Sequence, residues 1–159
     1  MDKKGGVVVT DEEMMAQALE QAYLALAEGE TPVGCVIAKE GRIIARGRNR
    51  RETEKDPTAH AEMEAIRAAA RATGDWRLTG CELYVTLEPC PMCAGAIVQA
   101  RLARVVYGAA DPRQGCAGSV YRVTEDPAFT HFCPADGGVL EKECRAVLDE
   151  FFQNARQGR

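Results

Sequence analysis

The fold is decided by residues 82–99, ELYVTLEPCPMCAGAIVQ, in which a strand pattern leads directly into a helix pattern. Glu82–Leu87 is short and rich in apolar and aromatic residues, which is typical of a strand. Pro91–Gln99 is predicted to be a helix, because proline is tolerated in the first helical turn. A strand that passes at once into a helix indicates a layered α/β domain.

Helices and strands alternate on both sides of this stretch. Thr10 and Glu13 form a capping-box signature, and apolar residues recur at helical spacing from there to Gly29. The other predicted elements are strands at 33–39, 42–47 and 104–107, and helices at 59–73 and 140–154. A polar loop is predicted at 48–58, and residues 111–134 are rich in turn formers. This order predicts an α/β sheet with helices on both faces and with its later strands parallel.

Size and composition narrow the class of protein. The 159 residues fit one domain over 1–159, with a flexible lead-in expected at 1–9 and a flexible tail at 155–159. Hydrophobic residues make up 46% of the chain and charged residues 28%, which argues against a disordered protein. No apolar run approaches the ~18 residues of a membrane span. Seven cysteines are an odd number for a secreted disulfide framework, so we expect a cytoplasmic protein.

The charge is unevenly distributed along the chain. A formal net charge of −4 argues against a general nucleic-acid coat protein. Arginines gather at 42–51 and again at 101–122, whereas acidic residues gather in the first and last predicted helices. Such a chain can present one basic face to a nucleic acid. The same arginines can also be scattered solubilising charges, and the sequence leaves both interpretations open.

Three residues have the chemistry of a zinc site. His60, Cys90 and Cys93 supply one imidazole and two thiolates, one ligand fewer than a closed structural site uses. Three protein ligands and an open position are typical of a catalytic zinc, which we expect at one ion per subunit. Both sequence fragments are predicted at helix N-termini, where the positive potential favours thiolates. Glu62 stands beside His60, as a group that moves protons near the metal would.

Each of these residues also has a plainer interpretation. Cys90 and Cys93 form a Cys-x-x-Cys pair that opens a helix, which is also the pattern of a thioredoxin-like redox site. A structural zinc would need a fourth ligand, and His131 is the only other histidine. Glu62 on its own would be a solvated helix carboxylate. The plainer functions are a redox module and a structural-zinc binding module, and stoichiometric zinc would exclude the redox module, which would instead cycle a Cys90–Cys93 disulfide.

The combined pattern resembles a known family. His-x-Glu followed by Pro-Cys-x-x-Cys is similar to the signature of zinc nucleobase deaminases. Over roughly residues 12–156 the chain most resembles bacterial tRNA-specific adenosine deaminases, notably at 32–34, 56–62, 83–90 and 111–119. The resemblance implies a three-layer α/β/α cytidine-deaminase-like fold with a mixed sheet of about five strands. It also implies hydrolysis of adenosine to inosine at the wobble position of a tRNA anticodon. The alternative is deamination of a free base or nucleotide such as guanine, cytosine or dCMP.

The resemblance also implies roles for particular residues. Glu62 would take a proton from the attacking water and return protons to the ring and the departing ammonia. The residues implied to hold the nucleoside are Asn49, Val33, Ala59, Leu87 and Asp111. Candidates for RNA contact are Arg48, Arg50, Arg113, Phe151 and Phe152, although core packing is an alternative for at least one phenylalanine. The implied partners are a tRNA anticodon stem-loop and a second copy of the chain, with no membrane.

Overall fold

The structure is a computed structural model that describes residues 9–158. The lead-in expected at 1–9 therefore lies outside the described residues except for Val9, and so does Arg159 of the expected tail. Within 9–158, no helix has both the length and the apolar character needed to cross a membrane.

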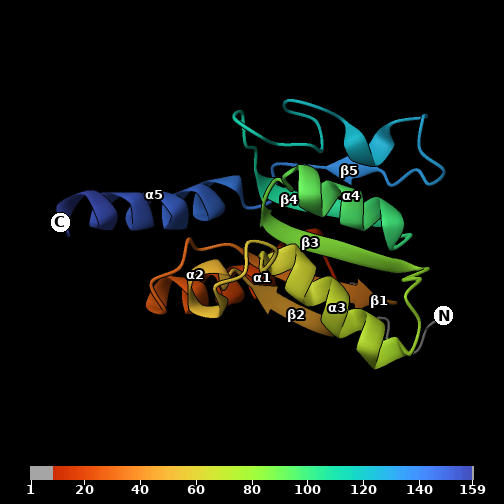
Figure 1. Cartoon of the computed structure of the whole chain (residues 1–159), viewed down its shortest axis with the longest axis horizontal. Coiled ribbons are helices and arrows are strands. Elements are labelled where there is room, and N and C mark those ends of the chain that lie inside the picture. The colour runs from red at the N-terminus through yellow and green to blue at the C-terminus, as the bar shows by residue number, and fades with distance from the viewer. Residues whose placement is uncertain (1–8, 159) are drawn as a thin grey trace.

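The centre of the structure is one five-stranded sheet with the order β2-β1-β3-β4-β5 (Figure 1). The strands are β1 Gly34–Lys39, β2 Arg42–Arg48, β3 Cys81–Leu87, β4 Arg104–Ala109 and β5 Ala135–Asp136. β1 is antiparallel to both β2 and β3, whereas β3, β4 and β5 run parallel. The predicted mixed sheet with parallel later strands is confirmed.

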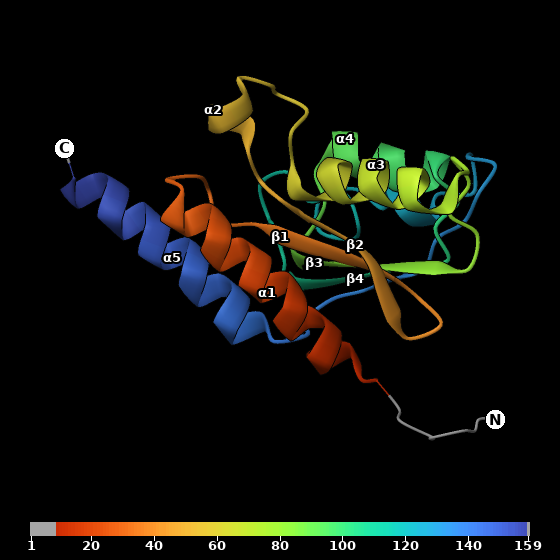
Figure 2. The ribbon, with the colours of Figure 1, turned by 90° about the horizontal axis from the view of Figure 1, so that it is seen from below.

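Helices cover both faces of the sheet, which confirms the three-layer α/β/α arrangement. Figure 2 shows α3 and α4 on one face and α1 and α5 on the other. The long helices are α1 Asp11–Ala27, α3 Ala61–Thr73, α4 Pro91–Gln99 and α5 Glu141–Gln157. Alternate strand residues feed two separate cores: Ile37 and Leu83 pack toward α3 and α4, whereas Val36 and Tyr84 pack toward α1 and α5. The period of two in the strands therefore separates the two layers.

Several boundaries differ from the sequence prediction. A short helix, α2 (Arg51–Glu54), lies inside the predicted polar loop, and a 3-10 turn (Val123–Glu125) and β5 lie after residue 111. These pieces are two to four residues long, too short to show a period in sequence. α5 continues through Gln157, so residues 155–157 of the expected tail are helical.

A close approach of backbone to backbone fixes where α3 begins. A Cβ on Gly47 of β2 would lie 2.3 Å from the carbonyl oxygen of Ala61, the first residue of α3. Only glycine leaves room for this contact, so α3 starts directly against β2. His60 immediately precedes α3 as its N-cap residue, and Glu62 lies in its first turn. The sheet therefore positions two of the residues that the sequence singles out.

Candidate active site

The N-termini of α3 and α4 converge on one point. His60 is the N-cap of α3, and Cys90 is the N-cap of α4, with Pro91 in the first turn. Neither side chain caps its own helix, so both are available to each other. Cys93 lies in the first turn of α4 and is fully buried. The predicted meeting of two helix starts is confirmed, although His60 lies just outside α3 rather than within it.

The three side chains have the spacing of a zinc site. His60 Nδ1 lies 3.6 Å from the Cys90 sulfur and 3.5 Å from the Cys93 sulfur, and all three ligand atoms lie within 4.8 Å of one another. Tetrahedral zinc, with bonds of ~2.1 Å to nitrogen and ~2.3 Å to sulfur, requires a nitrogen–sulfur separation of ~3.6 Å. The donor set and its geometry therefore fit Zn²⁺.

The fourth position of the site has no protein ligand among residues 9–158. His131, the candidate for a closed structural site, instead places Nε2 2.6 Å from the carbonyl oxygen of Leu102. It does not belong to the group of potential metal ligands. Three protein ligands with an open flank match a catalytic zinc rather than a structural one.

The two sulfurs behave electrostatically as a pair that needs a cation. The hydrogen bond from the Cys93 thiol, helped by His60, lowers the pKa of Cys90 to about 4. The same contact with Cys90, together with burial, raises the pKa of Cys93 far above its usual range. The first thiol thus ionises easily and the second does not, unless a positive ion lies between them. Because His60 is equally close to both sulfurs, the arrangement suits metal binding better than a dithiol redox pair.

Glu62 is a buried carboxyl group next to the metal site. Its side chain is 3% exposed, and it is not a member of the ligand group. Burial raises the pKa of Glu62 to about 7. A carboxyl group with that pKa can both accept and release a proton near neutral pH. The solvated carboxylate that the sequence alone allows is therefore not what the fold produces.

These groups open into a cavity of about 690 Å³, within the usual range for small-molecule sites. His60, Glu62 and Cys90 line this cavity, whereas Cys93 is fully buried and does not. Of the residues predicted to hold a nucleoside, those that line the cavity are Val33, Asn49, Leu87 and Asp111. Ala59 is fully buried and does not line the cavity.

Two of the lining residues are held in fixed orientations. The Asn49 amide donates to the carbonyl of Thr31 (3.1 Å) and accepts from the backbone N–H of Arg51 (3.2 Å). This leaves Asn49 one N–H and one lone pair for a ligand. One oxygen of Asp111 accepts from the backbone N–H of Arg113 (3.0 Å), so the Asp111 side chain folds back on its own loop.

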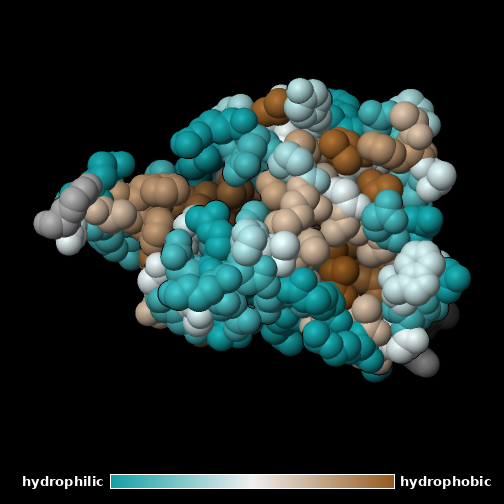
Figure 3. Space-filling view, in the orientation of Figure 1, coloured by the Kyte–Doolittle hydropathy of each residue, from teal (hydrophilic) through white to brown (hydrophobic). Residues whose placement is uncertain are grey.

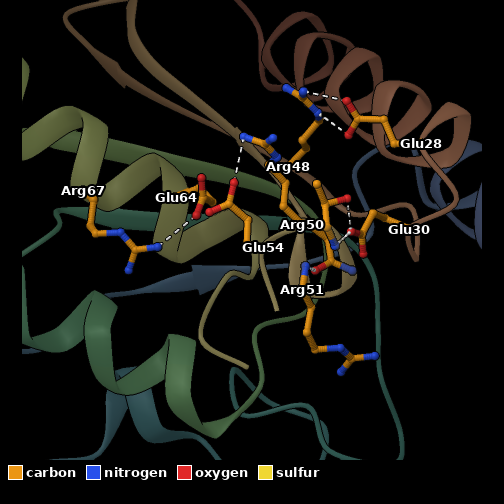
Figure 4. Close-up of polar contacts among 10 residues, drawn as sticks. Glu28, Glu30, Arg48, Arg50, Arg51, Glu54, Glu64 and Arg67 are labelled. Atoms are coloured by element: carbon orange, nitrogen blue, oxygen red, sulfur yellow. Dashed lines mark hydrogen bonds and ion pairs between the residues drawn. The ribbon is translucent and has the colours of Figure 1, made fainter. Parts of the chain in front are cut away.

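The candidates for RNA contact separate into two groups. Arg113 and Phe152 line the cavity, and Phe151 packs against Phe152 edge to face with ring centroids 5.3 Å apart. Arg48 and Arg50 do not line the cavity, and each pairs with a glutamate, at 2.8 Å to Glu28 and 3.4 Å to Glu54 (Figure 4).

The lining residues that the sequence does not predict are Thr31, Arg51, Ala61, Glu88, Pro112, Gln114, Arg145, Leu148 and Asp149. Three of these share one face of α5 with Phe152, at positions i, i+3, i+4 and i+7. That spacing could have identified them as one face of a helix. No sequence pattern predicts that Arg51 lines the cavity, because its position depends on how α2 folds. Figure 4 shows the Arg51 side chain pointing away from Glu28 and Glu54.

Comparison with known proteins gives a consistent result. Residues 8–109 match the cytidine and deoxycytidylate deaminase zinc-binding region. The chain is 48% identical over 147 residues to a tRNA-specific adenosine deaminase of Bacillus subtilis, covering 92% of this chain and 91% of that protein. A solved structure from studies of A-to-I editing by tRNA:A34 deaminases at the wobble position of transfer RNA is 44% identical, with a TM-score of 0.81 over 84% of this chain and 97% of that one. A guanine deaminase from Bacillus subtilis is 45% identical with a TM-score of 0.62, over 64% of this chain and 66% of that one.

Proposed function

This chain belongs to the cytidine and deoxycytidylate deaminase family and, within it, to the tRNA-specific adenosine deaminases, and from that premise we propose that it converts adenosine to inosine at the wobble position of a tRNA anticodon. The observation that carries the proposal is the open-flanked group His60, Cys90 and Cys93 beside buried Glu62, at the floor of a cavity large enough for a nucleoside. A structural metal or redox site would need neither the carboxyl group nor the cavity.

The chemistry assigned to the chain is proton transfer by Glu62. Zinc held by His60, Cys90 and Cys93 would act as a Lewis acid that makes water nucleophilic near neutral pH. Glu62 accepts the proton that the attacking water loses as its oxygen bonds to C6 of adenine. Glu62 passes that proton to the ring nitrogen, takes the second proton from the hydroxyl group now on C6 and gives it to the amine, so that ammonia leaves and a carbonyl remains. A pKa near 7 suits Glu62 to both directions of transfer.

The walls of the cavity would orient the nucleoside. Asn49 offers the nucleoside its remaining N–H and lone pair, fixed in direction by Thr31 and Arg51. Val33 and Leu87 supply apolar surface on either side. Ala59 is fully buried and does not line the cavity, so it would act only by packing. Asp111 lies where the neighbouring nucleotide would pass.

RNA recognition is proposed at the rim of the cavity. The target base must leave its stack to reach the floor, which costs less in an anticodon loop than in a duplex. Phe152 is 47% exposed and lines the cavity, so it is the better stacking candidate, with Phe151 supporting it from the side. Arg113 lines the same rim. Arg48 and Arg50 remain candidates, but each would have to exchange a glutamate partner for a phosphate.

We also propose that the protein is a cytoplasmic homodimer. Large apolar side chains lie exposed in the segment after β4, including Val120, Tyr121 and Phe132. Figure 3 shows apolar surface between α3 and α4, beside the hydrophilic surface over α3. A second copy of the chain would cover such surface. Light scattering of the zinc-loaded protein would test this, and a monomeric mass at micromolar concentration would contradict it.

A direct assay separates the proposed function from its nearest competitor. The purified zinc protein is incubated with an anticodon stem-loop. Mass spectrometry of the RNA fragments then shows whether the wobble adenosine has become inosine. Parallel reactions contain free guanine and free cytosine. Guanine deamination is the second candidate because the guanine deaminase of Bacillus subtilis is 45% identical over 64% of this chain. Turnover of guanine without turnover of the stem-loop would reverse the assignment.

A further inference from the structure

We propose that Glu88 is a positioning residue, whose buried carboxylate holds residues 111–119 in place as one wall of the substrate cavity. The proposal rests on the proposed function for its substrate. Glu88 follows the last residue of β3 and precedes the metal-binding segment. Residues 111–119, called the wall loop below, follow the end of the neighbouring parallel strand β4, where Leu87 lies opposite Ala109.

The Glu88 carboxylate is saturated with hydrogen bonds from the wall loop. Oε1 accepts from the backbone N–H of Asp111 (2.9 Å) and from the hydroxyl of Ser119 (2.5 Å). Oε2 accepts from the backbone N–H groups of Ala117 (3.0 Å) and Ser119 (2.9 Å). A carboxylate offers about four acceptor sites, so none is left for substrate or for a proton. Glu88 is 2% exposed, so it is as buried as Glu62. Because its acceptor sites are all occupied, its role is to hold the loop rather than to transfer a proton.

The wall loop is wrapped closely around this carboxylate. A Cβ on Gly115 would lie 2.3 Å from the carboxyl carbon of Glu88 and 2.5 Å from the carbonyl oxygen of Asp111. The backbone N–H of Cys116 donates to the carbonyl of Pro89 (2.8 Å), next to Glu88 in the chain. Both ends and the middle of the loop are thus tied to one short segment.

The hydrogen bonds of Glu88 should affect substrate binding more than the chemical step. The wall loop contributes Asp111, Pro112, Arg113 and Gln114 to the cavity lining. The metal ligands and Glu62 come from α3 and α4 and their N-caps instead. Loosening the loop should therefore weaken the hold on substrate while the reacting groups stay in place. If Glu88 served only the stability of the whole fold, replacing it would lower the free energy of unfolding. It would not weaken substrate binding or loosen residues 111–119 more than the rest of the structure.

The test compares two variants with a matched control. Glu88→Gln replaces one acceptor oxygen with an N–H₂ group that would face backbone donors. Gly115→Ala pushes the same loop away from the carboxylate but keeps the charge and both acceptor oxygens of Glu88. Glu82→Gln, at the other end of β3 and outside the cavity lining, is the control, because glutamine can still accept the hydrogen bond from Tyr84.

Four measurements are made on the zinc-loaded proteins: KM and kcat for the anticodon stem-loop, zinc content, and hydrogen exchange at residues 111–119. For Glu88→Gln and Gly115→Ala, KM should rise roughly 10- to 100-fold, because hydrogen bonds to a charged group are lost. The value of kcat should change less than about threefold. Amides of the wall loop should exchange faster than in the control, with zinc retained.

Other outcomes would overturn the proposal. Loss of zinc from Glu88→Gln, or a fall in kcat at unchanged KM, would mean that Glu88 acts through Cys90. Unchanged exchange and unchanged KM would mean that the carboxylate is not the anchor. If the unaltered protein does not deaminate the stem-loop, the proposed function fails, while exchange and zinc content still decide whether Glu88 holds the loop.

Discussion

Gly47→Ala offers a sharp test of how the fold positions the site. The added Cβ would lie 2.3 Å from the carbonyl oxygen of Ala61, whereas ordinary contact begins at 3.4 Å. α3 must therefore move about 1 Å away from β2 and carry His60 and Glu62 with it. A misplacement of about 1 Å can reduce catalysis by about 100-fold. Overpacking of this kind also lowers the free energy of unfolding by about 1–3 kcal/mol.

Two other glycines provide controls for Gly47→Ala. Gly34→Ala would place Cβ 2.0 Å from the carbonyl oxygen of Ala18, so it displaces α1, which carries none of the reacting groups. Gly95→Ala meets nothing within 4 Å and should stabilise α4 by roughly 0.5–1 kcal/mol. Each variant is assayed for unfolding in urea, zinc affinity and kcat/KM on an anticodon stem-loop.

The two overpacked variants should lose stability alike but differ in activity. We expect kcat/KM to fall by about 100-fold for Gly47→Ala, with weaker zinc binding, and to change little for Gly34→Ala at a temperature where both are folded. Equal activity of all three variants would refute the claim that the contact of α3 with β2 sets the positions of His60 and Glu62.

Three more predictions concern single groups. Glu62→Gln should lower turnover by about 10²- to 10⁴-fold at unchanged zinc content, and single-turnover inosine formation near the wild-type rate would exclude it as proton carrier. Replacing Arg113 with alanine should reduce the slope of log affinity against log salt by about 0.7, and an unaltered slope would remove Arg113 from the interface. The hydrogen bond from Arg104 lowers the pKa of Asp11, so this pair stabilises the fold above the unfolded pKa of Asp11 and loses its effect as pH falls through the native pKa. With both proteins metal-free, Asp11→Asn should have a lower free energy of unfolding than wild type near pH 7, by at most about 1 kcal/mol because the pair is accessible to solvent. In strong acid the two free energies should be equal, and a difference that persists there would contradict the pairing.

Local patterns in the sequence predicted the parts of the fold and site that local chemistry decides. Pro91–Gln99 is a helix with the predicted bounds, because its proline and apolar residues act within one segment. His60, Cys90 and Cys93 were identifiable because metal ligation restricts both residue type and spacing. Their convergence could be predicted as well, because it requires only that two helices packed on a layered sheet begin next to each other.

Contacts between distant segments could not be predicted in this way. α2 is held by Glu30, which accepts from the backbone N–H groups of Glu52 and Thr53, 22 and 23 positions later. Arg48 likewise meets Glu28 only after β2 has paired and α1 has packed. No periodicity records such polar pairs, because both partners look like ordinary surface residues in sequence. The same holds for Glu88 and the wall loop.

The open flank of the metal site is assigned to hydrolysis at C6 of a tRNA adenosine. To test this assignment, an anticodon stem-loop is treated with the zinc-loaded protein in ordinary water and in water enriched in heavy oxygen. The wobble nucleoside should gain about 1 Da in the first case and about 3 Da in the second, because the new carbonyl oxygen comes from solvent. An unchanged mass, or the same gain in both waters, would show that water bound at this site does not replace the amine of the wobble adenosine.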